Sequence, residues 1–226
     1  MSVPVTDPRW PKVLSLSVHE FRTPMTVVAG YIRMLLKDRA GPLNDQQRKL
    51  LEEAEKSCAR LSALLSEVSD LSNLEAGTAP INMGPLDLSA VLKEAVTTLP
   101  PLPDRDVPVT LDLMDGAAPF EGDAARLTLA FSSVIAALRR ELIGEHALIV
   151  RGRRSNDGFE VLMGDPPTID ALEQEPPDAR GVFDEWRGGV GLTLAVARRI
   201  LNAHGATITA APDGRKAGAR ILLSPA

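Results

Sequence analysis

The organisation of this chain is decided by the stretch Ser17-Val18-His19-Glu20-Phe21-Arg22-Thr23-Pro24. It sets a histidine beside a carboxylate within an otherwise apolar helical pattern. The apolar positions around it recur at alternating steps of four and three, which predicts a heptad seam rather than the broader stripe of a surface helix. These positions are Leu14, Val18, Phe21, Met25, Val28, Ile32 and Leu35. His19 therefore lies one residue off the seam, on an outward flank of the helix.

A second heptad pattern follows and predicts a second long helix. Its apolar positions are Leu51, Ala54, Cys58, Leu61, Leu65, Val68 and Leu71. Between the patterns, Gly41 and Pro42 end the first helix, and Asn44 with Gln47 predicts a capping box for the next. The short connection makes the two helices an antiparallel hairpin. Because one hairpin cannot bury both seams by itself, we expect it to dimerise into a four-helix bundle.

The hexapeptide from His19 to Pro24 resembles the H-box of the two-component sensor histidine kinases, and residues 8–77 resemble their dimerisation and phosphotransfer domain. The resemblance implies that His19 is the phosphoacceptor and Glu20 its acid/base partner. Thr23, one helical turn past His19, matches the position that in this family orients a water for removing phosphate from the response regulator. An unperturbed imidazole titrates near pH 6.5, so its neutral, nucleophilic form is available at neutral pH.

Taken singly, these residues have ordinary structural explanations. A lone histidine on a helix flank is usually a solvated surface residue, and Cys58 on the second seam fits a buried structural thiol. The complete hexapeptide beside a heptad seam favours the functional interpretation.

Composition sets further limits. The chain has 226 residues, which leaves room for the hairpin and one further domain. Its net charge of −5 predicts no basic face for nucleic acid. Its single cysteine cannot form an internal disulfide. No metal-ligand spacing occurs among its histidines and its cysteine, so we expect no metal site. It has no apolar stretch of about 20 residues and no signal-peptide pattern. We therefore expect a soluble cytoplasmic protein with no sensor domain of its own.

Helix-breaking residues between Gly77 and Pro80 predict a boundary between residues 1–77 and residues 78–226. In the second region, turn signals and alternation predict strands at 81–86, 109–113, 147–153, 159–164, 206–211 and 219–223. Helices are expected at 88–98 and 124–143, capped by Asp87 and Asp123, and at 192–203. Helices and hairpin strands in separate runs along the chain favour an α/β sandwich, which is a mixed sheet with helices on one face. The predicted fold class of the chain is α+β.

The second region resembles the ATP-binding catalytic domain of the same kinases. Its last helix is opened by Gly188-Gly189-Val190-Gly191-Leu192-Thr193-Leu194-Ala195, which resembles the family's second glycine box. Such glycines let the backbone approach phosphate, and the helix N-terminus offers N–H groups to it. The resemblance makes Gly189 and Gly191 the candidate nucleotide-binding residues, although Thr193 stands where a third glycine is usual. His204 falls where the family also tends to have histidine, and we interpret it as a structural end to the helix.

At other positions of the nucleotide site, this sequence has different residues from those usual in the family. In the register set by Asp123, the two asparagines of the N-box fall on Ser133 and Ala137, and its basic residue falls on Arg140. The second asparagine is the family's magnesium ligand, and alanine has no oxygen to offer a hard cation. The magnesium contact is therefore expected to be lost.

The next box is replaced as well. In one register, Met163 stands where the family has an aspartate that accepts a hydrogen bond from adenine, and Asp165 and Pro167 stand at the glycines that follow. A register shifted by two residues places Asp165 at the adenine position but still leaves prolines and threonine in place of the glycines. Methionine is a weak acceptor, and proline removes both a donor and the freedom of glycine. Residues 165–178, at the place of the family's ATP lid, are acidic and proline-rich. Such a lid would repel a polyphosphate, and an ordinary solvated loop is the alternative.

Three hypotheses follow for the function. The first is a dimeric histidine phosphotransferase that exchanges phosphate between His19 and an aspartate of a response-regulator receiver domain and needs no cofactor. The second is an active histidine kinase with a divergent nucleotide site, which would use ATP and magnesium. The third is a non-catalytic regulator that binds its partners through the bundle. The intact phosphoacceptor motif argues against the third, and the losses at Ala137 and Met163 argue against the second.

Overall fold

The structure is a computed structural model that describes residues 10–142, 147–155, 158–174, 181–186, 191–212 and 217–224. It contains two compact units, Met1–Ala79 and Pro80–Ala226. The described part of the first unit folds as two long helices, and the second combines helices with a mixed sheet. The predicted α+β class is confirmed.

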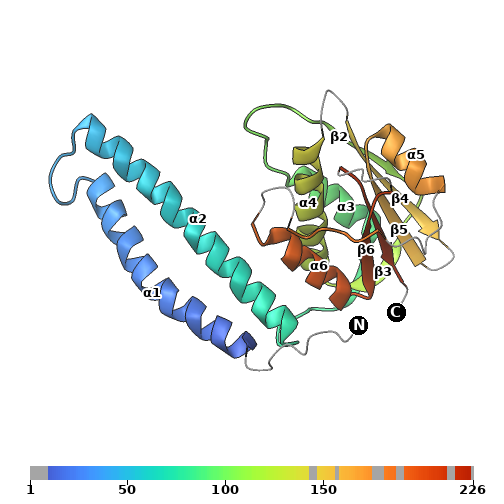
Figure 1. Ribbon diagram of the computed structural model, residues 1–226, viewed down its shortest axis with the longest axis horizontal. Helices are drawn as coiled ribbons and strands as arrows, with labels where there is room; N and C mark the ends of the chain where they lie inside the picture. Colours follow the sequence, from blue (N-terminus) through green and yellow to red (C-terminus); the bar gives the residue numbers. More distant parts are fainter. Residues whose placement is uncertain are drawn as a thin grey trace. The chain divides into compact units, whose positions relative to one another are not determined.

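The first unit is an antiparallel hairpin of α1 (Trp10–Leu36) and α2 (Asp45–Glu75), as Figure 1 shows. Its buried cluster is small and consists of Ala29, Ile32 and Cys58, with Met25, Leu36, Leu51 and Ala54 packed around it. The seam residues Phe21 and Val28 are instead 61% and 48% exposed. The apolar surface of α1 is therefore divided between a part that packs on α2 and a part that faces outward.

The turn between the two helices is fixed by polar contacts. The predicted capping box is confirmed, because the Asn44 side chain accepts a hydrogen bond from the Gln47 N–H at 2.8 Å and the Gln47 side chain accepts one from the Asn44 N–H at 3.0 Å. Arg48 donates to the Leu36 carbonyl at 3.0 Å and to both carboxylate oxygens of Asp38 at 2.9 and 3.0 Å. The first turn of α2 thus holds the last turn of α1.

The second unit contains two sheets. A short antiparallel pair is formed by β1 (Gly84–Asp87) and β3 (Pro119–Gly122). The main sheet has the order β2-β4-β5-β7-β6, in which only the β2–β4 pair is parallel. Its strands are β2 (Val109–Leu113), β4 (Leu148–Ser155), β5 (Gly158–Gly164), β6 (Ala206–Ala210) and β7 (Ala219–Leu223). The sequence does not predict β3, because four residues that begin with proline carry no readable alternation.

Three helices pack against one face of the main sheet (Figure 1). They are α3 (Leu88–Thr97), α4 (Ala124–Glu141) and α6 (Thr193–Ala203). The predicted caps are confirmed: Asp87 accepts a hydrogen bond from the Ser89 N–H at 3.0 Å, and Asp123 accepts one from the Arg126 N–H at 3.1 Å. The main core of this unit is built from fully buried residues of these helices and the strands, among them Leu92, Phe131, Leu138, Leu194, Val150 and Val161.

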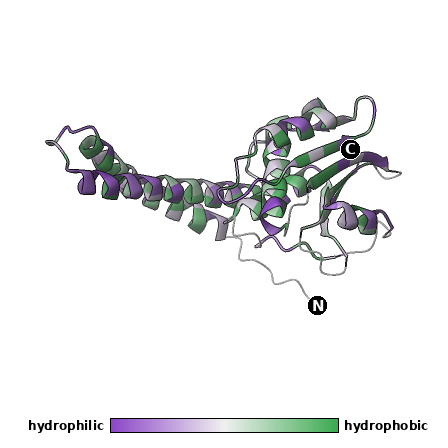
Figure 2. Cartoon of the chain, turned by 90° about the horizontal axis from the view of Figure 1, so that it is seen from above, coloured by the Kyte–Doolittle hydropathy of each residue, from purple (hydrophilic) through white to green (hydrophobic). Residues whose placement is uncertain are grey.

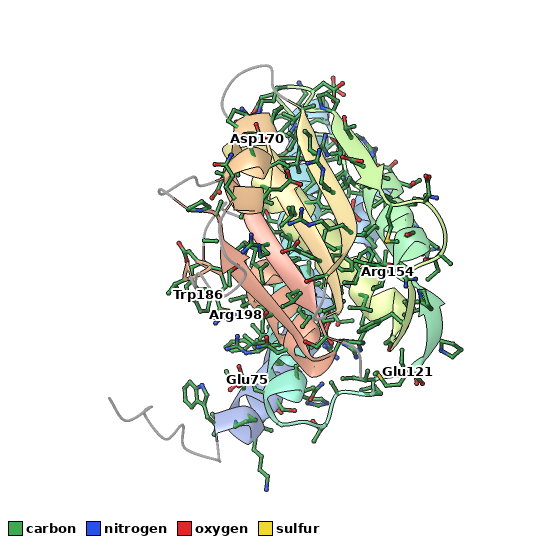
Figure 3. All side chains as sticks on the ribbon, turned by 90° about the vertical axis from the view of Figure 1, so that its right-hand side faces the viewer. Glu75, Glu121, Arg154, Asp170, Trp186 and Arg198 are labelled. Atoms are coloured by element: carbon green, nitrogen blue, oxygen red, sulfur yellow. The ribbon has the colours of Figure 1, made fainter. Side chains whose placement is uncertain are left out.

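A fourth helix, α5 (Pro166–Gln174), covers the other face of the sheet, which Figure 3 views from the front. The expectation that helices lie on one face only is therefore wrong, as is the expectation of a lid or loop for the described residues 165–174. Asp165 caps α5 by accepting a hydrogen bond from the Thr168 N–H at 3.1 Å. Pro166 and Pro167 occupy the first turn, where helix N–H groups have no partner within the helix. The Asp-Pro-Pro sequence is thus a helix start.

The predicted structural role of His204 is confirmed, because it is the C-cap residue of α6. Its buried ring joins two helix ends, because Nδ1 lies 2.7 Å from the Ile200 carbonyl and Nε2 accepts a hydrogen bond from the Asp123 N–H at 3.0 Å. The Asp123 carboxylate also accepts a hydrogen bond from the Asn82 N–H at 2.9 Å. Burial by itself would raise the pKa of Asp123, but the hydrogen bonds from Asn82 and Arg126 hold this pKa below its ordinary value.

This lowered pKa predicts a pH dependence of stability. The contribution of the Asp123 carboxylate is present above the ordinary pKa of 3.8 and is lost as the pH falls below it through the folded value. Asp123→Asn should lower the free energy of unfolding by about 1–3 kcal/mol at neutral pH, because its amide cannot accept both backbone hydrogen bonds. Denaturant unfolding from about pH 6 to about pH 3 should show the difference from the wild type shrinking. The exposed control Asp115→Asn should show no such difference; a constant difference for Asp123→Asn would contradict the prediction.

Candidate functional site

His19 and Glu20 face solvent on α1. Their side chains are 77% and 73% exposed, and the His19 Nδ1 lies 3.6 Å from the Glu20 Oε1. This distance is longer than a hydrogen bond and is close enough for the carboxylate to stabilise a positive charge on the ring. Because Nδ1 is turned toward the carboxylate, Nε2 is the ring nitrogen directed away from it. The arrangement leaves one nitrogen accessible to a reacting group, with a carboxylate behind the other.

Thr23 lies one turn further along the same helix. Its exposed hydroxyl donates to the His19 carbonyl at 3.4 Å. Pro24, which lies inside α1, has no N–H to donate to the Glu20 carbonyl, so the helix ladder is interrupted next to the histidine. The structure therefore brings His19, Glu20 and Thr23 together within about one turn of a helix, all of them open to solvent.

The two candidate glycines are placed unequally. Gly189 lies outside the described residues. Gly191 has a φ of 70°, in the left-handed region that favours glycine, and it directly precedes the start of α6. Leu192, at the N-cap of α6, makes no side-chain capping hydrogen bond. This helix start therefore combines a left-handed glycine with a helix N-terminus, as anion-binding turns do, and begins with the polar residue Thr193.

The replaced positions of the N-box face the protein interior. Ala137 is fully buried on α4, and Ser133, one turn before it, donates its hydroxyl to the Leu129 carbonyl at 2.7 Å. Arg140 lies at the surface beside an open depression of about 430 Å³, which is also lined by Leu102, Pro103, Asp104 and Arg105. No oxygen is available from Ala137 for a magnesium ion.

The adenine side of the site is also altered. Met163 is fully buried on β5, and the chain then enters α5 at the place of the family's glycines. The Thr168 methyl group fills the space beside Gly164, which ends β5, and Gly218, which precedes β7, because a Cβ at these glycines would lie 2.6 or 2.4 Å from its Cγ2. Pro167 stands exposed in the first turn of α5. Ala137 therefore offers no oxygen ligand to magnesium, and Met163 would be only a weak hydrogen-bond acceptor for adenine.

Within the described ranges, no group of three or more histidine, cysteine, aspartate or glutamate side chains is arranged to hold a metal ion. The helices in the same part of the chain include none with the length and apolar character needed to cross a bilayer.

Comparisons with known proteins agree with the hairpin and with the second unit. Residues 12–77 match the family model of the His Kinase A (phospho-acceptor) domain. The chain is 28% identical over 204 residues to the circadian input-output histidine kinase CikA of Synechococcus elongatus, which covers 86% of this chain and 27% of that protein. It is 24% identical over 206 residues to the cell-division control histidine kinase PdhS of Brucella abortus, covering 82% of this chain and 20% of that protein. The chain thus spans about a quarter of the length of these relatives.

Solved structures show the same fold. The crystal structure of full-length ShkA in complex with AMPPNP aligns with a TM-score of 0.72 and 22% identity, over 96% of this chain and 46% of that one. The Acinetobacter baumannii histidine kinase AdeS aligns with a TM-score of 0.57 and 20% identity, over 91% of this chain and 97% of that one. The hairpin, its matched phosphoacceptor domain and the α/β unit together define a signalling protein of the two-component histidine kinase type. Residues 12–77 belong to the His Kinase A (phospho-acceptor) domain family, and the chain is similar to histidine kinases over most of its length.

Proposed function

We propose that this chain carries a phosphoryl group on His19 and exchanges it with an aspartate of a response-regulator receiver domain. The observation that carries the proposal is the contrast between the two units. The His19–Glu20 pair is intact and exposed on the matched domain, whereas Ala137 and Met163 remove two separate contacts to magnesium ATP.

The chemistry follows from the geometry of the pair. The lone pair of Nε2 attacks the phosphorus of a receiver aspartyl phosphate, an N–P bond forms, and the P–O bond to the aspartate breaks so that a free carboxylate leaves. The ring becomes cationic in this step, and the Glu20 carboxylate beside Nδ1 stabilises the cation and takes its proton. The reverse step returns the phosphoryl group to a receiver.

A second candidate, an ATP-dependent kinase with a divergent nucleotide site, is supported by two observations. Gly191 keeps the left-handed backbone that precedes the last helix, and the structural relative ShkA was crystallised with AMPPNP. The labelling experiment below distinguishes the two candidates.

The donor of the phosphoryl group is tested by two labelling reactions. Purified protein with magnesium ATP should acquire no acid-labile phosphate, because the magnesium and adenine contacts are missing. A phosphorylated receiver domain should pass its label to the wild type and not to His19→Ala. Labelling from ATP that disappears in His19→Ala would instead establish the kinase. Absence of both labels would favour a non-catalytic binding protein.

Thr23 is proposed to orient the water that removes phosphate from the partner regulator. Thr23→Ala should slow this loss about tenfold, since a misplaced water loses near-attack geometry, while transfer through His19 continues unchanged. Thr26→Ala is the matched control, because the Thr26 hydroxyl bonds back to the Arg22 carbonyl at 2.8 Å in the same manner. Equal losses of both rates in Thr23→Ala would contradict this role.

We further propose that the active form is a homodimer whose hairpins make a four-helix bundle. The outward part of the α1 seam, with Phe21 and Val28, and Leu61 on α2 supply apolar surface for it. Figure 2 shows such hydrophobic residues interspersed with hydrophilic ones along the hairpin. Association through these positions would bury large side chains that each gain about 1.5–3 kcal/mol on leaving water.

The dimer is tested by substituting glutamate for each of two residues that are exposed to nearly the same extent. Phe21 on the seam is 61% exposed, and Leu16 off the seam is 63% exposed. Phe21→Glu should give a monomer in light scattering after size-exclusion chromatography, because it places charges in the bundle core, and Leu16→Glu should remain a dimer. A wild type that is monomeric, or the same mass for both variants, would rule out this interface.

A further inference from the structure

Few apolar side chains make up the contact between α5 and the sheet. Ile169 and Leu172 of α5 are buried against Leu162 and Ala211, with Ile149 packed at the margin. The main core of the unit lies on the opposite face, because Leu162 alternates with Val161 and Met163 along β5. The helix α5 therefore contributes few of the buried side chains that hold this unit together.

A further attachment of α5 is ionic and centres on Glu173. Its carboxylate accepts hydrogen bonds from Arg151 at 2.9 Å and from Arg153 at 3.1 Å. The two arginines project to the same face because they are two residues apart on β4. Each has a second partner on the sheet, Asp112 at 2.7 Å for Arg151 and Glu160 at 2.6 Å for Arg153. The hydrogen bonds that Arg151 donates, first to Glu173 and then to Asp112, raise the pKa of Arg151 above its ordinary value.

A buried ion pair lies on the same sheet face. The Arg220 Nε is 3.0 Å from the Glu160 Oε1, and both side chains are only 4% exposed. Arg220 also donates to the Leu172 carbonyl of α5. The cross-strand register sets Arg220 opposite Leu162, which α5 covers. Movement of α5 would therefore expose a charged pair together with an apolar strand face.

We propose that α5 is a detachable cover, latched to the sheet by Glu173 between Arg151 and Arg153, which opens without unfolding the rest of the second unit. Segments with few buried apolar contacts open locally at a lower free energy than the core. The Glu173 side chain and those of both arginines are about one-third exposed (30–39%), so salt weakens the latch. When the latch opens, Arg151 and Arg153 keep Asp112 and Glu160 as partners, which limits the cost of opening. The cover thereby switches the second sheet face between a closed and an exposed form.

Hydrogen exchange of the full chain, followed by mass spectrometry, tests the latch. Glu173→Gln should speed exchange in peptides of α5 by about three- to tenfold, the range expected for loss of partly exposed ion pairs, and leave α4 and α6 unchanged. Asp170→Asn is the matched control, since Asp170 is an exposed acid on the same helix (Figure 3). In about 1 M sodium chloride, where screening acts within ~3 Å, α5 of the wild type should exchange faster, and Glu173→Gln should respond less.

The proposal is overturned if Glu173→Gln exchanges no faster than Asp170→Asn, or if α5 in the wild type exchanges only at the rate of α4 and α6. It is also overturned if Glu173→Gln speeds exchange equally in all elements, because Glu173 would then support the whole unit. The measurement involves no phosphate transfer, so its outcome is independent of the proposed function.

Discussion

The constraint on which the structure of the first unit depends is that α1 carries more apolar surface than α2 can cover. Ala29 and Ile32 are buried against α2 around Cys58, while Phe21 remains outward on the same seam. His19 lies one residue off this seam, so its ring stays in solvent whichever part of the seam is covered. An exposed imidazole on a rigid helix is what phosphoryl exchange with a second protein requires, because the receiver must approach the nitrogen directly.

The second unit combines the fold of a histidine-kinase nucleotide domain with different side chains at the positions that would hold the nucleotide. Ala137 and Met163 have become core residues. The segment at the place of the lid is a capped helix that packs on the opposite sheet face. These features are consistent with one another. As the helix α5, this segment makes apolar and ionic contacts with the sheet that a mobile lid would lack. The fold is retained while the chemistry proposed for it rests on the hairpin.

Local polar signals predicted the helix starts well. The capping box of Asn44 and Gln47, the caps at Asp87 and Asp123, and the role of His204 at the end of α6 are confirmed. Each cap includes a contact within one turn of a helix end, which the local sequence is sufficient to predict. The strand β3 and the helix α5 were not predicted, because β3 is defined by pairing with distant β1 and the prolines of α5 are equally compatible with a loop.

The sequence by itself determined the two helical seams and the position of His19 beside one of them. Periodicity and residue chemistry are local properties, and they need no partner to be read. Only the tertiary structure decided which half of the α1 seam is buried, and only it showed that α5 covers the second sheet face. Both depend on contacts between segments far apart in the chain. The bridge from Glu173 to Arg151 and Arg153 is of this kind, because the sheet register brings the arginines to the face that α5 covers.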